Sequence, residues 1–208
     1  ERMAKMDLAV ATSFLAICLG MDPIMVGATP AQKEKWVRKI ADEGLIVAYG
    51  VTEPEAGSNV QSLKTKAERV LDEKGNIIGY KINGQKQFIS NAGFADVFVT
   101  YAKVDGDKFT SFIVERKFEG VSTDEEENKM GMKGSSTRSV IFTDAKVPVE
   151  NVLGEVGKGH IVAFNTLNIG RFKLGGGCVG SAKSALQDAV TYAKQRVQFG
   201  KSIAEFGM

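Results

Sequence analysis

The stretch between residues 45 and 147 most restricts how this chain can fold, because strand-like runs follow one another there with no helical pattern between them. Strands are expected at residues 45–51, 63–70, 77–82, 85–89, 96–104, 109–116 and 139–142. Short polar turns separate them, and Asn83-Gly84 predicts a two-residue hairpin. Strands joined by short turns pair antiparallel, so the stretch predicts an antiparallel barrel or sandwich and not a Rossmann sheet.

Helical patterns flank these strands. Apolar residues at helical spacing predict a helix over residues 4–21. Thr29 and Gln32 fit a capping box around Pro30, and Gly44 fits the end of that second helix. Helical spacing returns after residue 157 and predicts one long helix. We therefore expect an α+β protein with three parts: residues 1–44 as the end of a helical domain, 45–157 as a β-domain, and 158–208 as the start of a second helical domain.

Composition excludes several functions. The net charge of +2 is too small to indicate nucleic acid, and no stretch approaches the about 20 uncharged apolar residues of a membrane span. The single histidine, His160, excludes a His-rich metal site and is expected to cap or pack at a helix start. Cys18 and Cys178 are expected to be buried, reduced thiols of an intracellular protein. The chain begins in the middle of a helical pattern and stops without a terminal helix, so we expect a piece of a longer protein.

Two patterns are better explained by structure than by ligand binding. Gly175-x-Gly177-x-x-Gly180 matches the dinucleotide fingerprint, but it follows no strand and lies inside a helical pattern. These glycines and Gly176 are expected to pack tightly against a neighbouring helix. The acidic run at residues 124–127 is expected to be a solvated loop.

Six motifs occur in order along the chain. They are TEPEAGSN at 52–59, INGQKQFISNAG at 82–93, MGMKGSSTRSVIF at 130–142, VPVENVLGEVGKG at 147–159, NIGRF at 168–172 and RVQFGK at 196–201. The first follows an apolar run, and by itself it suits either a ligand site or an ordinary surface turn. Together the six resemble the acyl-CoA dehydrogenases, and the part from residue 115 onward most resembles their very-long-chain branch.

This resemblance implies a flavoprotein that uses FAD to dehydrogenate a long-chain acyl-CoA at its α,β carbons, giving the trans-2-enoyl-CoA in fatty-acid β-oxidation. It also implies a homodimer or homotetramer that passes electrons to an electron-transferring flavoprotein. The compartment would be the cytoplasm of a bacterium or the mitochondrial matrix of a eukaryote. An acyl-CoA oxidase and a non-enzymatic protein that binds flavin or acyl-CoA are the alternatives.

In the β-domain, the resemblance implies five cofactor contacts. The backbone of Val51 and the hydroxyl of Thr52 match positions that bind the flavin ring, and Ser58 matches one at the FAD pyrophosphate or the CoA side of the cleft. Phe88 matches an aromatic residue against the flavin face, although a strand core residue is the alternative. Ser90 matches a hydroxyl near flavin N5, where a neutral donor stabilises incoming negative charge.

In the second helical part, the resemblance implies two sets of contacts. Asn168 matches a position facing the pantetheine of CoA, and Arg171 an arginine near the active site. Arg196, Gln198 and Phe199 match a stretch that reaches the FAD of a neighbouring subunit, where a guanidinium suits a pyrophosphate. One chain would then be unable to complete its own FAD site.

The resemblance also shows what this chain lacks. The reaction needs a carboxylate to remove the α proton. A minority of the family place this Glu just before the helix arginine, where this chain has Gly170. The majority place it beyond the equivalent of Met208, and Glu53 and Glu55 are not candidates. We therefore expect no catalytic base in these residues, and no dehydrogenase activity from them alone.

Overall fold

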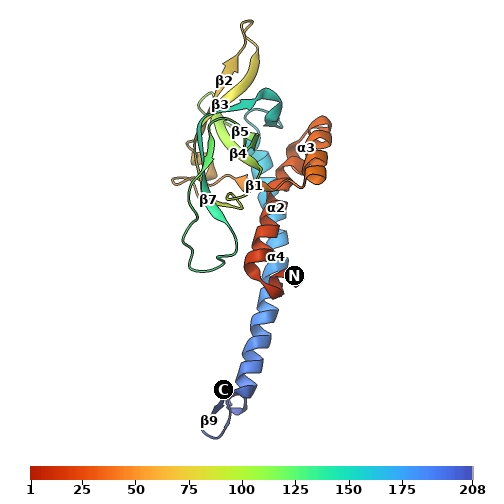
Figure 1. Cartoon of the computed structure of the whole chain (residues 1–208), viewed down its shortest axis with the longest axis vertical. Helices are drawn as coiled ribbons and strands as arrows, with labels where there is room; N and C mark the ends of the chain where they lie inside the picture. Colours follow the sequence, from red (N-terminus) through yellow and green to blue (C-terminus); the bar gives the residue numbers. More distant parts are fainter. Residues whose placement is uncertain (208) are drawn as a thin grey trace.

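Residues 1–207 are described by the computed structural model, in which helices at both ends of the chain flank a sheet (Figure 1). The first part contains α1 (Arg2–Met6), α2 (Leu8–Gly27) and α3 (Pro30–Glu43). The predicted helix at residues 4–21 is therefore two helices. They separate at Asp7, whose carboxylate accepts hydrogen bonds from the N–H groups of Ala9 and Val10 and so caps α2.

Both predicted ends of α3 are confirmed. The Thr29 side chain accepts from the Gln32 N–H while the Gln32 side chain accepts from the Thr29 N–H, which completes the capping box. Gly44 ends the helix in the left-handed conformation with φ of 66°. Trp36 is completely buried beneath this helix, as its apolar face predicts.

One expectation about membranes needs correction. By length and composition, α2 is a helix that could cross a membrane, and in the described part of the chain it is the one that passes this test. The sequence did not predict this possible span because Asp22 and Pro23 interrupt the apolar run. Since α2 packs on β1 and on the last helix of the chain, and core helices pass the same test, the finding is weak evidence for a span.

The sheet is mixed. Its strands are β1 (Val47–Gly50), β2 (Lys66–Leu71), β3 (Ile77–Ser90), β4 (Val97–Val104), β5 (Lys108–Glu115), β6 (Val121–Thr123), β7 (Thr137–Pro148) and β8 (Val152–Leu153). Their order is β6-β7-β3-β2-β4-β5-β8, with β1 also beside β4. The α+β class is confirmed, but the strands are not all antiparallel, because β1 and β2 each run parallel to β4. These two lie end to end along one edge of β4, and residues 51–65 leave the sheet between them.

The predicted hairpin at Asn83-Gly84 is wrong. β3 runs straight through both residues and pairs with β7 from Gly79 to Ser90, so the long ladder prevails over the turn preference of the dipeptide. The glycine is used differently, with φ of 149° at a shift in the register between β3 and β7. A Cβ on Gly84 would lie 2.4 Å from the Thr65 hydroxyl oxygen, so this position also requires close backbone approach.

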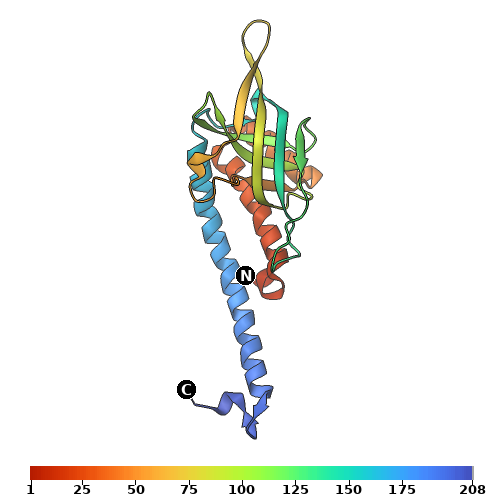
Figure 2. The same cartoon turned by 90° about the vertical axis from the view of Figure 1, so that its left-hand side faces the viewer.

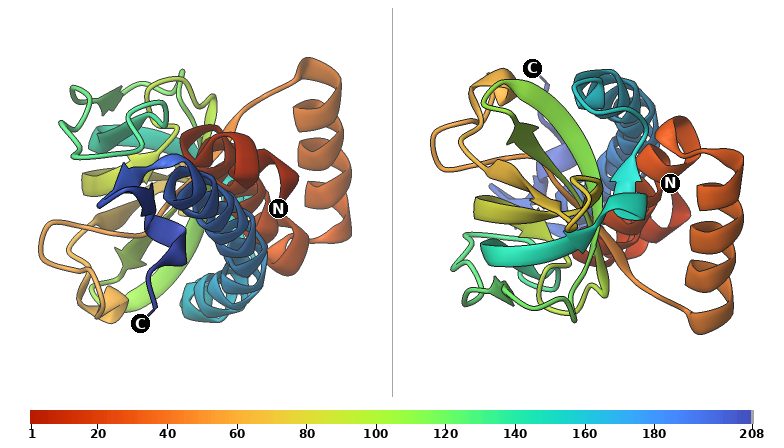
Figure 3. Two further views of the ribbon diagram at one scale, coloured as in Figure 1. Left: turned by 90° about the horizontal axis from the view of Figure 1, so that it is seen from below. Right: turned by 90° about the horizontal axis from the view of Figure 1, so that it is seen from above.

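Helices cover one face of the sheet. Ile24 of α2 and Trp36 of α3 pack with Val47, Val97 and Leu153 in one buried cluster. A second cluster fills the concave side of the sheet around β3, β4, β5 and β7. Figure 3 shows α3 standing to the side of the sheet, beyond α2.

The last helix, α4 (Gly159–Gln195), is long, as predicted. It lies against α2 and α1 as far as Lys183, and the remainder extends away from the rest of the molecule (Figures 1 and 2). Tight helix packing is confirmed at Gly177 and Gly180, where a Cβ would meet Leu15 and the backbone of Glu1. It is wrong for Gly175 and Gly176, which have no neighbouring atom within 4 Å of an added Cβ among the described residues.

The cysteine prediction is partly wrong. Both thiols are free, but Cys18 is only half-buried and Cys178 is exposed on α4. Helical spacing predicted burial of Cys178, but Gly177 and Gly180 on either side of it are the buried residues that face α2 and α1, and Cys178 lies on another face of α4.

An ion pair lies inside the β-domain. Lys86 Nζ lies 2.6 Å from Glu53 Oε1, with side-chain exposures of 0% and 3%. Lys86 also donates to the Tyr101 carbonyl, and Glu53 accepts from the Thr65 hydroxyl and the Lys64 N–H. The two buried charges thus receive hydrogen bonds from neighbouring segments of the chain as well as from each other.

The two groups of this pair stay charged at neutral pH. Burial lowers the pKa of Lys86 to about 8, although the Glu53 carboxylate opposes this shift. Burial acts to raise the pKa of Glu53, but the Lys86 ammonium and the hydrogen bonds from Lys86, Thr65 and the Lys64 N–H outweigh it and leave that pKa below its ordinary value. The pair therefore joins the segment after β1 to β3 by a charged contact.

Replacing Lys86 with Met should destabilise the fold strongly, because it leaves the Glu53 carboxylate buried without its cation. We expect a loss of about 3 to 5 kcal/mol in the free energy of unfolding, and a smaller loss for the double variant Lys86→Met/Glu53→Gln. Urea unfolding measures both. Lys146→Met, which removes the exposed pair with Glu119, is the control and should cost little. Equal costs for Lys86→Met and Lys146→Met would contradict this account.

Replacing Gly84 with Ala tests the close approach to Thr65. The variant forces Thr65, and with it a donor to Glu53, out of place, so we expect a loss of about 2 to 3 kcal/mol in urea unfolding. Gly75→Ala is the matched control, because Gly75 also has positive φ but has open space around an added Cβ. It should cost about 1 kcal/mol from backbone strain alone. If the two variants cost the same, backbone conformation and not the contact explains Gly84.

Candidate functional site

The segment that leaves the sheet after β1 is a tight turn attached to β3. Glu53 and Ala56 exchange two backbone hydrogen bonds of 3.1 Å each. The Thr52 carbonyl accepts from the Gln87 N–H at 2.9 Å. Val51 is buried and Thr52 half-buried, so both lie at the base of the turn. The rigid base of the turn is thus fixed to β3 through its backbone at Thr52 and through its side chain at Glu53.

Ser58 lies beyond residues 52–56, the part of this turn that hydrogen bonds hold in place. Its side chain is exposed, and a short 3₁₀ helix, Val60–Ser62, follows it. Ser62 donates to the Asn59 carbonyl at 2.7 Å and so closes the end of the turn. Among the sequence-predicted residues of the β-domain, Ser58 has the fewest constraints on its side chain.

Phe88 lies at a bulge in β3. The register between β3 and β7 shifts between Lys86 and Ile89, and Phe88 has φ of 58°. A bulky residue in this conformation is an outlier that persists only where its surroundings impose it. The bulge turns the residue outward, leaving it 58% exposed. Phe88 is therefore not a core residue, and a planar ligand could lie against its ring.

Two residues after Phe88, Ser90 lines a cavity of about 250 Å³ between α2 and α4. α2 contributes Thr12, Leu15, Ala16 and Leu19 to the wall, and α4 contributes residues between 167 and 174. The cavity is thus largely apolar, with one hydroxyl from the sheet. It brings together two predicted site residues, Ser90 and Arg171.

The α4 wall of this cavity carries its charged side chains. Arg171 donates to the Asn168 side chain at 2.9 Å, which holds its guanidinium near the helix. Lys173 pairs with the buried Asp22 of α2 at 2.6 Å and joins the two helices. Gly170 also lines the cavity, and a Cβ there would lie 2.8 Å from Leu19. None of the described residues lining the cavity is a carboxylate.

The other three predicted cofactor residues lie elsewhere. Arg196 follows α4, and Phe199-Gly200 forms the turn between β9 (Val197–Gln198) and β10 (Lys201–Ser202). At 1.5 Å per residue, α4 places this hairpin roughly 35 Å beyond Arg171, and Figure 1 shows β9 at the opposite end of the molecule from the sheet. Phe199 is 94% exposed and has φ of 51°. The hairpin therefore does not contribute to the cavity of its own chain.

Sequence reasoning passed over Lys86 and considered Glu53 only as a base to be rejected. The alternation of inward-facing and outward-facing residues along β3 predicts that Lys86 is buried. Tyr80 and Ile82 point inward, and Lys86 has the same parity, so an alternating strand places this lysine in the core. A buried lysine requires a buried acid, and Glu53 follows the nearest apolar strand. No group of three or more His, Cys, Asp or Glu suited to a metal ion occurs in residues 1–207.

Comparison with known families gives two matches. The family described as "Acyl-CoA dehydrogenase, middle domain" matches residues 48–145, and "Acyl-CoA dehydrogenase, C-terminal domain" matches residues 157–208. A probable acyl-CoA dehydrogenase of Bacillus subtilis is 52% identical over 190 residues, covering 91% of this chain and 31% of the relative.

Two further relatives differ in the substrate named. The mitochondrial very long-chain specific enzyme of Macaca fascicularis is 41% identical, covering 97% of this chain and 32% of the relative. The short-chain specific enzyme of Megasphaera elsdenii is 40% identical, covering 99% of this chain and 54% of the relative. The chain thus spans between about a third and a half of the length of these relatives.

Solved structures agree with these matches. Acyl-CoA dehydrogenase complexed with FAD from Bacillus anthracis superposes with a TM-score of 0.89 at 50% identity, over 95% of this chain and 34% of that one. A structure described as the electron transferring flavoprotein of Acidaminococcus fermentans gives 0.89 at 36% identity, over 98% and 53%. The prolyl acyl carrier protein oxidase AnaB gives 0.88 at 28% identity, over 96% and 53%. The order of motifs, the two family matches and the shared fold lead to one conclusion: this chain belongs to the acyl-CoA dehydrogenase family.

Proposed function

We propose that this chain forms the cofactor-holding part of an FAD-dependent acyl-CoA dehydrogenase, an oxidoreductase acting on CH–CH bonds. The observation that carries the proposal is the bulge at Phe88, which turns an aromatic ring outward two residues before Ser90 enters an apolar cavity. A planar ring system against Phe88 and an acyl chain in the cavity would then meet near Ser90. The relative from Bacillus anthracis was solved with FAD, which supports this cofactor.

The residues present fit this cofactor chemically. FAD, when bound, accepts the hydride that leaves the β carbon of the substrate. The Thr52 hydroxyl and the backbone at Val51 would bind polar edges of the flavin, and the pinned turn would keep them in place. The Ser90 hydroxyl would donate a hydrogen bond toward the negative charge that the hydride brings. Ser58 and Asn168 would contact the CoA part, and Arg171 would supply positive charge beside it.

The group that removes the α proton of the substrate must lie outside this cavity wall. The wall contains no carboxylate among the described residues, and Gly170 stands at the position where the family resemblance places the base of a minority of members. We infer that a carboxylate from elsewhere in the complete enzyme removes the α proton. Acyl-CoA and FAD bound to these residues alone would then not react.

We further propose long-chain substrates, a role in β-oxidation and electron transfer to an electron-transferring flavoprotein. The likeness of residues 115–208 to the very-long-chain branch supports the substrate length. The identities to the very-long-chain and short-chain relatives are 41% and 40%, so a series of acyl-CoA chain lengths is the deciding measurement. Reaction of the reduced enzyme with air tests the final step, because fast peroxide formation would indicate an oxidase, as the likeness to AnaB allows.

Phe88→Ala should weaken FAD binding, because it removes the ring that we place against the flavin. Titration with FAD, followed by quenching of flavin fluorescence, should give roughly three- to tenfold lower affinity, in line with the about 0.5 to 1.5 kcal/mol of an aromatic contact. Phe94→Ala is the matched control, since Phe94 is 51% exposed and close in sequence. Equal affinities for the two variants would exclude Phe88 as a cofactor residue.

A second prediction follows from the lack of a carboxylate among the described residues of the cavity wall. When the chain is loaded with FAD and mixed anaerobically with an acyl-CoA, the visible flavin absorbance should remain unbleached, because no described residue of the cavity removes the α proton. Full-length relatives provide the positive control. Substrate-dependent bleaching by this chain alone would show that the base has been misplaced.

A further inference from the structure

The turn that follows Ser90 is held at several points. Asn91 has φ of 65°, and its carbonyl accepts from the N–H groups of Phe94 and Ala95. The Asn91 side chain donates to the Ser13 carbonyl of α2 at 2.8 Å. The turn therefore joins the sheet to the α2 wall of the cavity, directly beside the Ser90 hydroxyl.

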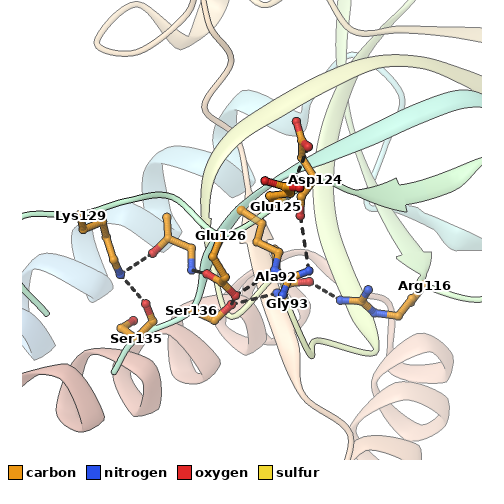
Figure 4. Close-up of polar contacts among 11 residues, drawn as sticks. Ala92, Gly93, Arg116, Asp124, Glu125, Glu126, Lys129, Ser135 and Ser136 are labelled. Carbon is orange, nitrogen blue, oxygen red and sulfur yellow. Dashed lines mark hydrogen bonds and ion pairs between the residues drawn. The ribbon is translucent and has the colours of Figure 1, made fainter. Parts of the chain in front are cut away.

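Arg116 holds the far side of this turn. Its guanidinium donates to the carbonyl of Ala92 (Figure 4) and to the carbonyl of Ala95. Five N–H donors in a rigid plane suit two carbonyls of one turn, so Arg116 limits how far residues 92–95 can move.

The near side is held by Ser136 and Glu126. The Ser136 carbonyl accepts from the Asn91 N–H at 2.8 Å, and the Ser136 hydroxyl accepts from the Gly93 N–H at 3.1 Å. That hydroxyl in turn donates to Glu126 Oε1 at 2.6 Å (Figure 4). Ser136 is therefore the only residue between the Glu126 carboxylate and the turn along this path.

Glu126 is fixed by further donors. Arg138 Nε donates to Oε1 at 2.8 Å, and the Thr137 N–H donates to Oε2 at 2.8 Å. Burial acts to raise the pKa of Glu126, but the hydrogen bonds from Ser136, Arg138 and the Thr137 N–H, with the charge of Arg138, lower it to about 2. The prediction that residues 124–127 form a solvated loop is confirmed, since Glu126 lies in a loop and is exposed. In addition, these hydrogen bonds hold Glu126 in place as a charged group at neutral pH.

Gly93 shows how closely these parts fit. A Cβ on Gly93 would lie 2.5 Å from the Ser136 hydroxyl oxygen, 2.7 Å from Glu126 Oε1 and 3.0 Å from Arg138 Nε. The position thus admits glycine alone unless the network moves. Thr137, which donates to Glu126, is also the partner of Ser90 in the ladder between β3 and β7. Glu126 consequently reaches Ser90 by two routes, one through the strand and one through the turn.

We propose that Glu126 is a positioning residue for the cavity, which through Ser136 and Thr137 sets the place of the Ser90 hydroxyl. It touches neither cofactor nor substrate, and its effect on them passes through Ser90. The inference rests on the proposed function, because positioning Ser90 matters only if this hydroxyl lies beside the flavin and the substrate.

The test compares Glu126→Ala with Glu125→Ala. Glu125 belongs to the same acidic run, is exposed, and makes no side-chain hydrogen bond or ion pair among the described residues. In Glu126→Ala, amide hydrogen exchange at Asn91 and Gly93 should be at least about tenfold faster than in Glu125→Ala, with β4 and β5 unchanged. FAD affinity should fall about fivefold in Glu126→Ala only, and Glu126→Gln, which keeps an acceptor for Ser136, should recover part of it.

A double-variant cycle separates positioning from general stability. If Glu126 acts through Ser90, the loss of FAD affinity caused by Glu126→Ala should largely vanish in a Ser90→Ala background. Additive losses, or unchanged exchange at Asn91 and Gly93, would overturn the proposal. If the unsubstituted chain binds no FAD, the proposed function fails. The exchange data then still decide whether Glu126 fixes the turn.

Discussion

The ion pair between Lys86 and Glu53 is the contact on which the candidate site depends. Moving two charges out of water costs several kcal/mol each, and their attraction offsets this only when the other donors and acceptors are also satisfied. Here the Tyr101 carbonyl, the Thr65 hydroxyl and the Lys64 N–H supply further hydrogen bonds to the two charges. Such a pair tolerates little displacement. It therefore fixes the segment after β1 against β3, one residue after Thr52 and two residues before Phe88.

Local features of the fold could be predicted from the sequence, whereas contacts between distant segments could not. The capping box of α3 and the left-handed Gly44 involve residues within four positions of one another, and both are confirmed. Asn83-Gly84 carries an equally local signal, but pairing with β7, some sixty residues later, decides its conformation. The parallel placement of β1 beside β4 is likewise a tertiary result, because both strands look the same in sequence whichever way they pair.

For the candidate site, likewise, the identity of residues could be predicted from the sequence, whereas their geometry could not. The order of the motifs identified the family, and through it Phe88 and Ser90, without any knowledge of their geometry. The positive φ at Phe88 follows from a bulge against β7, which nothing near Phe88 in the sequence specifies. The contacts of Glu126 could not be predicted for a related reason. The acidic run is a solvated loop, as expected, but a serine and an arginine about ten residues later fold back onto one of its four acids.

The length of α4 has a consequence for assembly. Its 37 residues form a rod of roughly 55 Å that begins beside the cavity and ends in the β9–β10 hairpin. Arg196 and Phe199 cannot approach Phe88 of the same chain unless this helix breaks. If these two residues do bind FAD, the cofactor belongs to another copy, and each site requires two chains. The exposed Phe199, held at positive φ on a two-residue turn, is then explained as a side chain presented to a partner and not to its own core.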